Sequence, residues 1–199
     1  MKMYGPACYR DRMNHAEKPG MLPAQRALRL PEAVRNQVLA AMPQWGADYA
    51  KTDGLGRSVI HTAAANGDVS AIQFLVDRCG WQTGGLAALK LNQQTARMGD
   101  YCDVSPMAMA IMNKKWKAVE LLKSNGVNFY ADCCRLGNKD GKKINAHELV
   151  DQLRKTNRLS PADDIEIGDL LYSECLDMNQ RRFWKPGDAP PGLDPTYLK

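Results

Sequence analysis

The sequence predicts an all-α fold in which short helix–turn–helix units stack on one another. The stretch GRSVIHTAAANGDVSAIQFLV, which begins at Gly56, divides into two short helices around Gly67. Isolated helices shorter than about 12–15 residues are marginal in water, so each of these helices needs a packing partner. A similar helix pair recurs 47 residues further along the chain. Repeated pairs of this kind bury their apolar faces by stacking on their neighbours.

Composition and charge restrict the class of protein. The 199 residues suffice for one domain with a tail, and the net charge of +5 is mild for a chain of this length. Nucleic-acid-binding proteins usually carry a denser basic surface, so we expect a protein partner rather than DNA or RNA. No apolar run approaches the roughly 20 residues that a membrane-spanning helix needs, so we expect no membrane insertion.

The first twenty residues, MKMYGPACYRDRMNHAEKPG, contain no apolar run of the kind found in secretory signal peptides. We therefore expect a cytoplasmic protein. The alternative is export into a host or neighbouring cell by a route that needs no signal peptide.

The elements follow in order from the N-terminus. Residues 1–31 are rich in proline and scattered charge, and we expect them to form an irregular N-terminal arm. Apolar residues at the spacing of one helical face predict a helix at residues 32–42, which Pro43 ends. A glycine-containing connection follows at residues 46–57.

Two predicted helices make up the next unit. Ser58 can accept a backbone N–H bond as an N-cap, and the small alanines after it allow a neighbouring helix to approach closely. Gly67 breaks this first helix. From Val69 onward apolar residues recur every three or four positions, which predicts a second amphipathic helix that ends near Gly80.

The sequence also repeats itself, because a shift of 47 residues places one helix pair on another. The matched residues include Ser58 with Ser105, Ala63 with Ala110, Asn66 with Asn113, Ala71 with Ala118, Ile72 with Val119, and Leu75 with Leu122. Pro106 occupies the first helical position of the second copy, where proline is favoured. We infer a unit of helix, tight turn, helix and loop, with an insertion at residues 81–102.

The stretch DGLGRSVIHTAAANGDVSAIQFLVDRCG resembles an ankyrin repeat. The family pattern D-x-x-G-x-T-P-L-H-x-A-A-x-x-G is matched or conservatively replaced from Asp53 to Gly67. The stretch DVSPMAMAIMNKKWKAVELLKSNGVN is similar, although Ala108 replaces the family's histidine and Lys114 replaces its turn glycine. The resemblance is strongest at residues 45–80.

The resemblance implies an ankyrin-repeat stack over residues 32–155, in which a further repeat could open at 140–150. It also implies that His61 is a structural residue that connects adjacent loops. Beyond the stack we predict a helical C-terminal cap at residues 156–185 and a proline-rich tail at residues 186–199.

The sequence offers little for catalysis, so we expect no enzyme, no cofactor and no metal. A cysteine enzyme needs a cysteine, a histidine and an orienting polar group, and only Cys8 and His15 in the arm are candidates. The alternative function is an enzyme whose site is built by the arm and the insertion at 81–102. The vicinal Cys133 and Cys134 fit either two partly buried small residues or a soft-metal or redox pair.

We therefore predict a protein-recognition module that docks through the loop face of the ankyrin stack as a monomer or in a heterocomplex. One role is a bacterial effector or adaptor that binds a host protein, and the other is an immunity-like inhibitor that blocks an enzyme.

The loops at 48–57, 98–105 and 135–144 are expected to carry the contacts, with a hairpin finger at Asn138–Lys143. The predicted partner-binding residues are Tyr49, Lys51, Arg57, Asp100, Tyr101, Asp103, Arg135, Lys139 and Lys142. A secondary basic patch would consist of Lys114, Lys115, Trp116 and Lys117, unless Trp116 is buried in the core.

Overall fold

The computed structural model describes residues 12–15, 20–82, 96–137 and 140–177. The chain divides into two compact units, Met1–Gln152 and Leu153–Lys199. Within the described residues, no helix combines the length and apolar character that crossing a bilayer requires. The expected tail lies outside the described residues.

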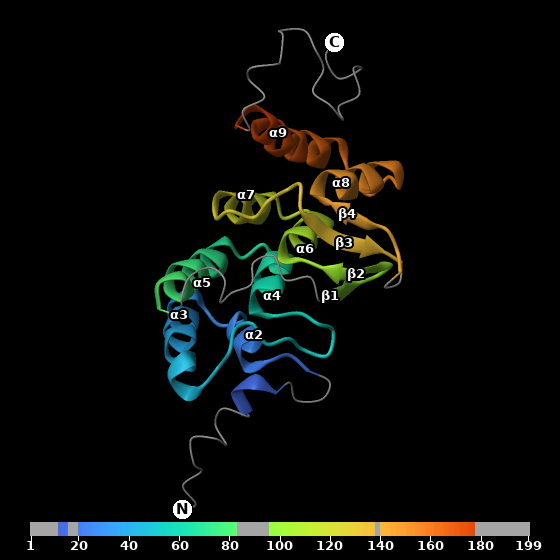
Figure 1. The fold of residues 1–199 in the computed structure, drawn as a ribbon. Helices are drawn as coiled ribbons and strands as arrows, with labels where there is room; N and C mark the ends of the chain where they lie inside the picture. The colour runs from blue at the N-terminus through green and yellow to red at the C-terminus, as the bar shows by residue number, and fades with distance from the viewer. Residues whose placement is uncertain (1–11, 16–19, 83–95, 138–139, 178–199) are drawn as a thin grey trace, which may run out of the picture. The chain divides into compact units, whose positions relative to one another are not determined.

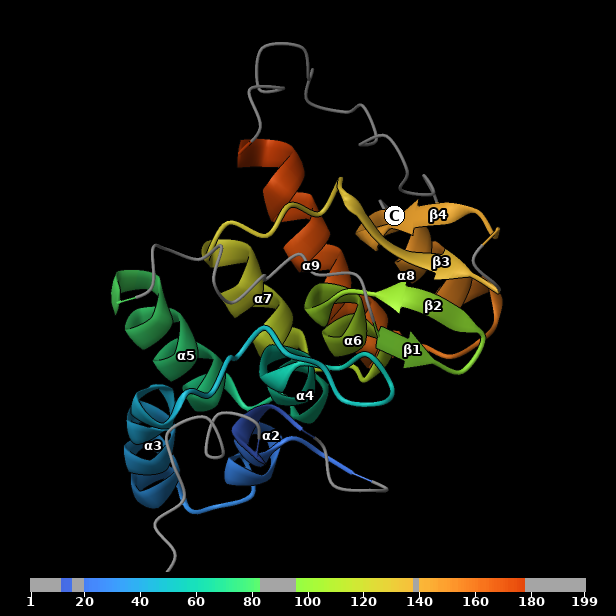
Figure 2. The same cartoon turned by 60° about the horizontal axis from the view of Figure 1, so that its bottom comes forward.

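Helix pairs make up most of the first unit (Figure 1 and Figure 2). The pairs are α2 (Pro23–Ala27) with α3 (Glu32–Ala41), α4 (Val59–Asn66) with α5 (Val69–Gln82), and α6 (Pro106–Met112) with α7 (Trp116–Ser124). A short 3-10 helix, η1 (Met42–Trp45), follows α3, and α8 (Ala146–Lys155) runs from the first unit into the second. The first helices form one layer, in which α2 packs on α4 and α4 on α6. The second helices form another layer, in which α3 packs on α5 and α5 on α7.

Helices α2 and α4 begin with the same hydrogen bond. The Leu22 N–H donates to Gln25 Oε1 at 2.7 Å, and the Ser58 N–H donates to His61 Nδ1 at 3.2 Å. In both helices the acceptor is the third helical residue, so α2 begins in the same way as α4, the first helix of the next pair. The expectation that the arm is irregular through residue 31 is therefore wrong for α2.

Helices α6 and α8 begin with related caps. Ser105 Oγ accepts a hydrogen bond from the Ala108 N–H at 3.2 Å, but the alanine has no group that can reach back to the cap. In α8 the Asn145 N–H donates to Glu148 Oε2 at 3.2 Å, and Asn145 Oδ1 accepts from the Glu148 N–H at 3.0 Å. This reciprocal capping box satisfies two N–H groups at the helix start. Helix α8 thus begins at residue 146 with a side-chain cap, as α6 does.

A four-stranded antiparallel sheet corrects the prediction of an all-α fold. Its strands, in spatial order, are β1 (Ala96–Met98), β2 (Tyr101–Val104), β3 (Asp132–Leu136) and β4 (Lys143–Asn145). The connections between helix pairs are long enough here to fold back as hairpins, and neighbouring hairpins pair through β2 and β3. Gly99 has a φ of 56°, a left-handed conformation that the tight β1–β2 turn requires.

Small side chains allow the inner helices to pack closely. Ala63, Ala64 and Ala110 are all fully buried, in the layer where α4 packs on α6. Close approach of this kind leaves no room for larger residues, because protein interiors are packed to crystal density. Larger buried side chains fill the space between the layers and under the sheet: Leu39, Ile60, Ile72, Leu75, Met107, Leu122 and Phe129.

In the second unit, α9 (Pro161–Asp177) begins at the predicted Ser160-Pro161 cap. The Asp163 N–H donates to Ser160 Oγ at 3.2 Å, and the Ser160 N–H donates to Asp163 Oδ2 at 3.0 Å. Arg154 pairs with Asp164 at 2.5 Å, which links the end of α8 to the first turn of α9. Helix α9 lies within the segment 156–185, where a helix was predicted.

Candidate protein-binding surface

Three fingers project from the connections between helix pairs. The first finger is the turn at Asp53–Arg57, the second is the β1–β2 hairpin, and the third is the β3–β4 hairpin. Only the third was expected as a hairpin. Its flanking strands confirm that expectation, and its tip at 138–139 lies outside the described residues.

The first finger is held by the side chain of Asp53. Asp53 Oδ1 accepts hydrogen bonds from the backbone N–H groups of Leu55 and Arg57, each at 2.9 Å. Asp53 Oδ2 accepts from Nε of Arg57 and lies 2.9 Å from a terminal guanidinium nitrogen of the same side chain. Two nitrogens of the guanidinium thus share one carboxylate oxygen, and hydrogen bonds between charged groups are stronger than neutral ones. The turn is therefore fixed before any partner binds.

Backbone hydrogen bonds join the three fingers into one row. The Arg97 N–H donates to the Leu55 carbonyl at 3.1 Å, which connects the second finger to the first. The Gly137 N–H donates to the Asp100 carbonyl at 2.6 Å, and Tyr101 lies opposite Leu136 in the β2–β3 pair. Figure 2 shows β1 to β4 side by side, with the connection before α4 next to β1. We call the exposed and half-exposed side chains of this row the finger surface.

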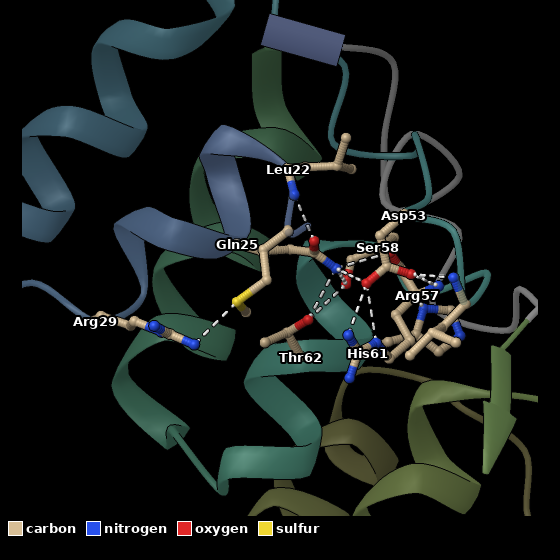
Figure 3. A network of polar contacts seen from close by, with 10 residues as sticks. Leu22, Gln25, Arg29, Asp53, Arg57, Ser58, His61 and Thr62 are labelled. Atoms are coloured by element: carbon tan, nitrogen blue, oxygen red, sulfur yellow. Dashed lines mark hydrogen bonds and ion pairs between the residues drawn. The ribbon is translucent and has the colours of Figure 1, made fainter. Parts of the chain in front are cut away.

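A buried glutamine connects the first helix pair to the first finger (Figure 3). Gln25 is fully buried, and its Nε2 lies 2.8 Å from the Arg57 carbonyl oxygen. The same nitrogen lies 3.0 Å from Thr62 Oγ1 and 3.2 Å from Asp53 Oδ2. The Gln25 amide on α2 thus donates hydrogen bonds to acceptor oxygens of the first finger.

His61 makes the equivalent connection one repeat later. Its Nε2 lies 3.0 Å from the Val104 carbonyl oxygen, and its Nδ1 lies 2.8 Å from Ser58 Oγ. Because a carbonyl oxygen can only accept, Nε2 carries the ring proton and Nδ1 accepts from the Ser58 N–H. Arg57 and Val104 each directly precede the N-cap of the next helix. The expected structural role of His61 is confirmed.

The structure separates the predicted partner-binding residues into two groups. Tyr49 and Tyr101 are each only 8% exposed, and the Tyr49 hydroxyl donates to the Leu39 carbonyl. The expectation that both tyrosines project from the loops is therefore wrong, because their rings are part of the core. The exposed or half-exposed residues are Lys51, Arg57, Asp100, Asp103, Arg135 and Lys142. Lys139 lies outside the described residues.

Ion pairs hold several of these side chains in place. Arg135 Nε donates to Asp103 Oδ2 at 2.8 Å, across the β2–β3 pair. Lys142 Nζ donates to Glu148 Oε1 at 2.7 Å. This bond, followed by the one from the Asn145 N–H, lowers the pKa of the Glu148 carboxyl. The third finger is thereby attached to the first turn of α8.

Two exposed residues of the finger surface were missed from the sequence. Leu55 is 52% exposed at the tip of the first finger, between Gly54 and Gly56. Arg97 is exposed on β1. An apolar residue between two glycines is a signal that could have identified Leu55. No comparable signal marks Arg97, because β1 lies within the predicted insertion at 81–102.

The predicted secondary patch is only partly a surface. Trp116 is 7% exposed, so it belongs to the core rather than to the patch. Lys114 and Lys117 are exposed at the start of α7. The Lys115 stem lies against the turn before α5, where a Cβ added to Gly67 would come within 2.7 Å of Lys115 Cδ. Of the four residues predicted for this patch, only Lys114 and Lys117 are exposed.

The candidate catalytic groups are not assembled into a site in the described residues. The Sγ atoms of Cys133 and Cys134 lie 4.0 Å apart, and both side chains of this pair on β3 are buried. Their hydrogen bond, together with burial, raises the pKa of the Cys133 thiol far above its ordinary value. No group of three or more His, Cys, Asp or Glu side chains in the described residues is arranged to hold a metal ion. His147 stacks on Tyr130, with the ring centroids 4.9 Å apart. Cys8 lies outside the described residues.

The comparison with family models agrees with this geometry. Residues 38–76, which run from α3 through the first finger to α5, match the model described as ankyrin repeats (many copies). Comparison with curated proteins gives no match. Ankyrin repeats generally mediate protein–protein interaction through extended surfaces and are typically not catalytic. Residues 38–76 of this chain are therefore similar to ankyrin repeats.

Proposed function

We propose that the chain recognises another protein through its finger surface. The observation that carries the proposal is the continuous set of hydrogen bonds that fixes the fingers, from Asp53 within the first finger to Gly137 in the third. Ordering loops at the moment of binding costs free energy. Loops that are already fixed avoid much of that cost.

An apolar residue flanked by arginines supports this assignment. Leu55 projects from the first finger, with Arg57 half-exposed beside it and the exposed Arg97 on the neighbouring strand. Burying apolar surface contributes about 25 cal/mol per Å², and arginine is enriched at protein interfaces. Leu55 would enter an apolar pocket of the partner, and the two arginines would contact its polar rim.

The charge pattern favours a partner of mixed charge. Arg57 is paired with Asp53, and Arg135 is paired with Asp103. Because these acids neutralise two of the basic groups, a polyanion would gain little from the surface. Charges of opposite sign that lie side by side largely cancel each other's electrostatic potential. We therefore expect the affinity for the partner to fall only modestly as the salt concentration rises.

Two biological roles fit a rigid recognition surface. The chain would act as an effector or adaptor that docks on a protein of another cell, or as an immunity-like inhibitor that covers the active site of an enzyme. The identity of the captured partner distinguishes the roles. Loss of that partner's catalytic activity on binding would assign the inhibitor role.

The first experiment is affinity capture from the native cell and from a plausible host lysate, followed by mass spectrometry. Binding of the purified partner is then measured for the finger variant Leu55→Asp with Arg97→Glu. We expect the affinity to fall more than tenfold, which corresponds to about 1.4 kcal/mol.

The matched control is Lys114→Glu with Lys117→Glu, a double change of exposed residues outside the fingers. We expect the control to bind within about threefold of the original chain, because these lysines lie outside the proposed surface. Circular dichroism verifies that both variants are folded. A finger variant with normal affinity, beside a control that has lost binding, would reject the proposal.

A further inference from the structure

A cavity of about 290 Å³ lies at the N-terminal end of the helix stack. Its walls come from residues 12–15, from α2 with its flanking residues, and from α3 and η1, and no residue of the three fingers lines it. Apolar side chains form most of these walls, including Ala27, Leu30 and Val38. A cavity of roughly 150 Å³ can accommodate a benzene molecule, so this one has room for a large aliphatic side chain.

Within the part of the chain that the structure describes, no further repeat packs on the helix face that lines the cavity. Arg35 and Leu39 are buried on the face of α3 directed at the next pair, where Arg35 bonds to Asp68 at 2.5 Å. Val38 lies one residue before Leu39. Because one helical turn takes 3.6 residues, Val38 is rotated by about 100° from Leu39 and lies off the face directed at the next pair. Val34, one turn before Val38, is 47% exposed. In a longer solenoid, a further repeat would stack on this face.

The rim of the cavity is basic. Arg12, His15 and Arg26 contribute to its lining, and all three residues are exposed. Among the described residues that line the cavity, none is acidic. An occupant with one large apolar group and adjacent carboxylates therefore matches both the walls and the rim.

Helix α9 presents a group of side chains with this chemistry. Ala162, Ile165, Glu166 and Asp169 follow the spacing of one helical face and are all exposed. Ile165 is 67% exposed, the largest exposed fraction among the large hydrophobic residues described. The two acidic residues lie one and four positions after it, so an apolar side chain and two carboxylates share one face.

We propose that α9 of a second copy of this chain docks in the cavity. Ile165 enters the apolar interior, and Glu166 and Asp169 lie against the basic rim that includes Arg26. Since the cavity and the helix are different surfaces, the contact is heterologous, and it generates rings or open chains of copies rather than a two-fold dimer.

The test is sedimentation velocity of the full chain over a wide dilution series. We expect the mean mass to rise with concentration, and we expect Arg26→Glu and Ile165→Asp each to weaken self-association more than tenfold. An equimolar mixture of these two variants should form a dimer and nothing larger, because it contains one intact cavity and one intact helix face per pair. Combining Arg26→Glu with Glu166→Arg in one chain should restore growth.

Several outcomes would overturn the proposal. These are a monomer at every concentration, self-association that neither variant weakens, and a mixture of the two variants that stays monomeric. Leu55→Asp is the matched control and should self-associate like the original chain, because it lies on the finger surface. Melting curves verify the fold of each variant. The finger proposal is unaffected by any of these results, since it is measured with a different partner.

Discussion

Replacement of His61 by alanine tests whether the inter-repeat hydrogen bonds stabilise the stack. The His61 ring is fully buried and bonded at both nitrogens, to Ser58 and to Val104. Alanine leaves the Ser58 N–H and the Val104 carbonyl without these partners. Each unsatisfied buried group costs about 1–3 kcal/mol, so we expect the free energy of unfolding to fall by about 3–5 kcal/mol.

The loss is measured by urea unfolding followed by circular dichroism, with the midpoint and the slope fitted separately. At about 2–4 °C for each kcal/mol in a chain of this size, the melting temperature should fall by roughly 10 °C. The slope should remain unchanged, because the mutation alters stability rather than the surface exposed on unfolding.

The matched control is His61→Gln. Gln25 makes both equivalent contacts one repeat earlier, accepting from the Leu22 N–H and donating to the Arg57 carbonyl. We therefore expect glutamine at position 61 to cost about 1 kcal/mol or less, within the usual range for one altered neutral hydrogen bond. Equal losses for alanine and glutamine, or no loss for alanine, would refute the assigned role of these bonds.

Three further predictions concern packing and charge. Ala63→Leu and Ala110→Leu should each lower the free energy of unfolding by about 1–3 kcal/mol in the same assay, because both alanines are fully buried between neighbouring helices; melting within a degree or two of the original chain would contradict this. Gly67→Ala should destabilise by about 1 kcal/mol or more, because its φ is 71° and an added Cβ would meet a lysine side chain at 2.7 Å; an unchanged midpoint would contradict the geometry. Because folding lowers the pKa of the Glu148 carboxyl, its ionised form adds to the free energy of unfolding. This contribution is present above the ordinary carboxyl pKa and is lost as pH falls through the folded-state pKa. Lys142→Ala should therefore make the free energy of unfolding less sensitive to acid pH, and an identical pH profile would count against the contact.

The helix pairs at 58–80 and 105–124 could be predicted because their apolar residues recur with a helical period. Helix α2 could not be predicted in this way, because five residues span too little of the period. Its identity depends on Gln25, which makes the contacts of a histidine but does not match the family pattern. Tertiary hydrogen bonds, rather than local periodicity, define this helix.

The sheet was missed because its strands contain only three to five residues. Such short strands show no clear alternation of apolar and polar residues. Their pairing depends on neighbouring hairpins, as between Tyr101 and Leu136, and these residues are far apart in the sequence. The register between β2 and β3 therefore depends on how the helix pairs stack, and not on the local sequence of either strand.

The sequence identified loops that lie next to one another, but it did not identify which of their side chains are exposed. The loop regions around Arg57, Asp103 and Arg135 do lie next to one another in the fingers. Tyr49 and Tyr101 were expected at the surface because aromatic residues are common interface anchors. An aromatic residue in a loop can equally fill the core beneath it, and only the packed structure distinguishes these positions.

Hydrogen–deuterium exchange of the full chain, with and without its captured partner, tests directly whether the fingers form the binding surface. We expect the bound partner to slow exchange of amides at 53–57, 96–104 and 132–137, while amides at the start of α7 are unchanged. Protection confined to residues 114–124, with no change in the three fingers, would contradict docking through the finger surface.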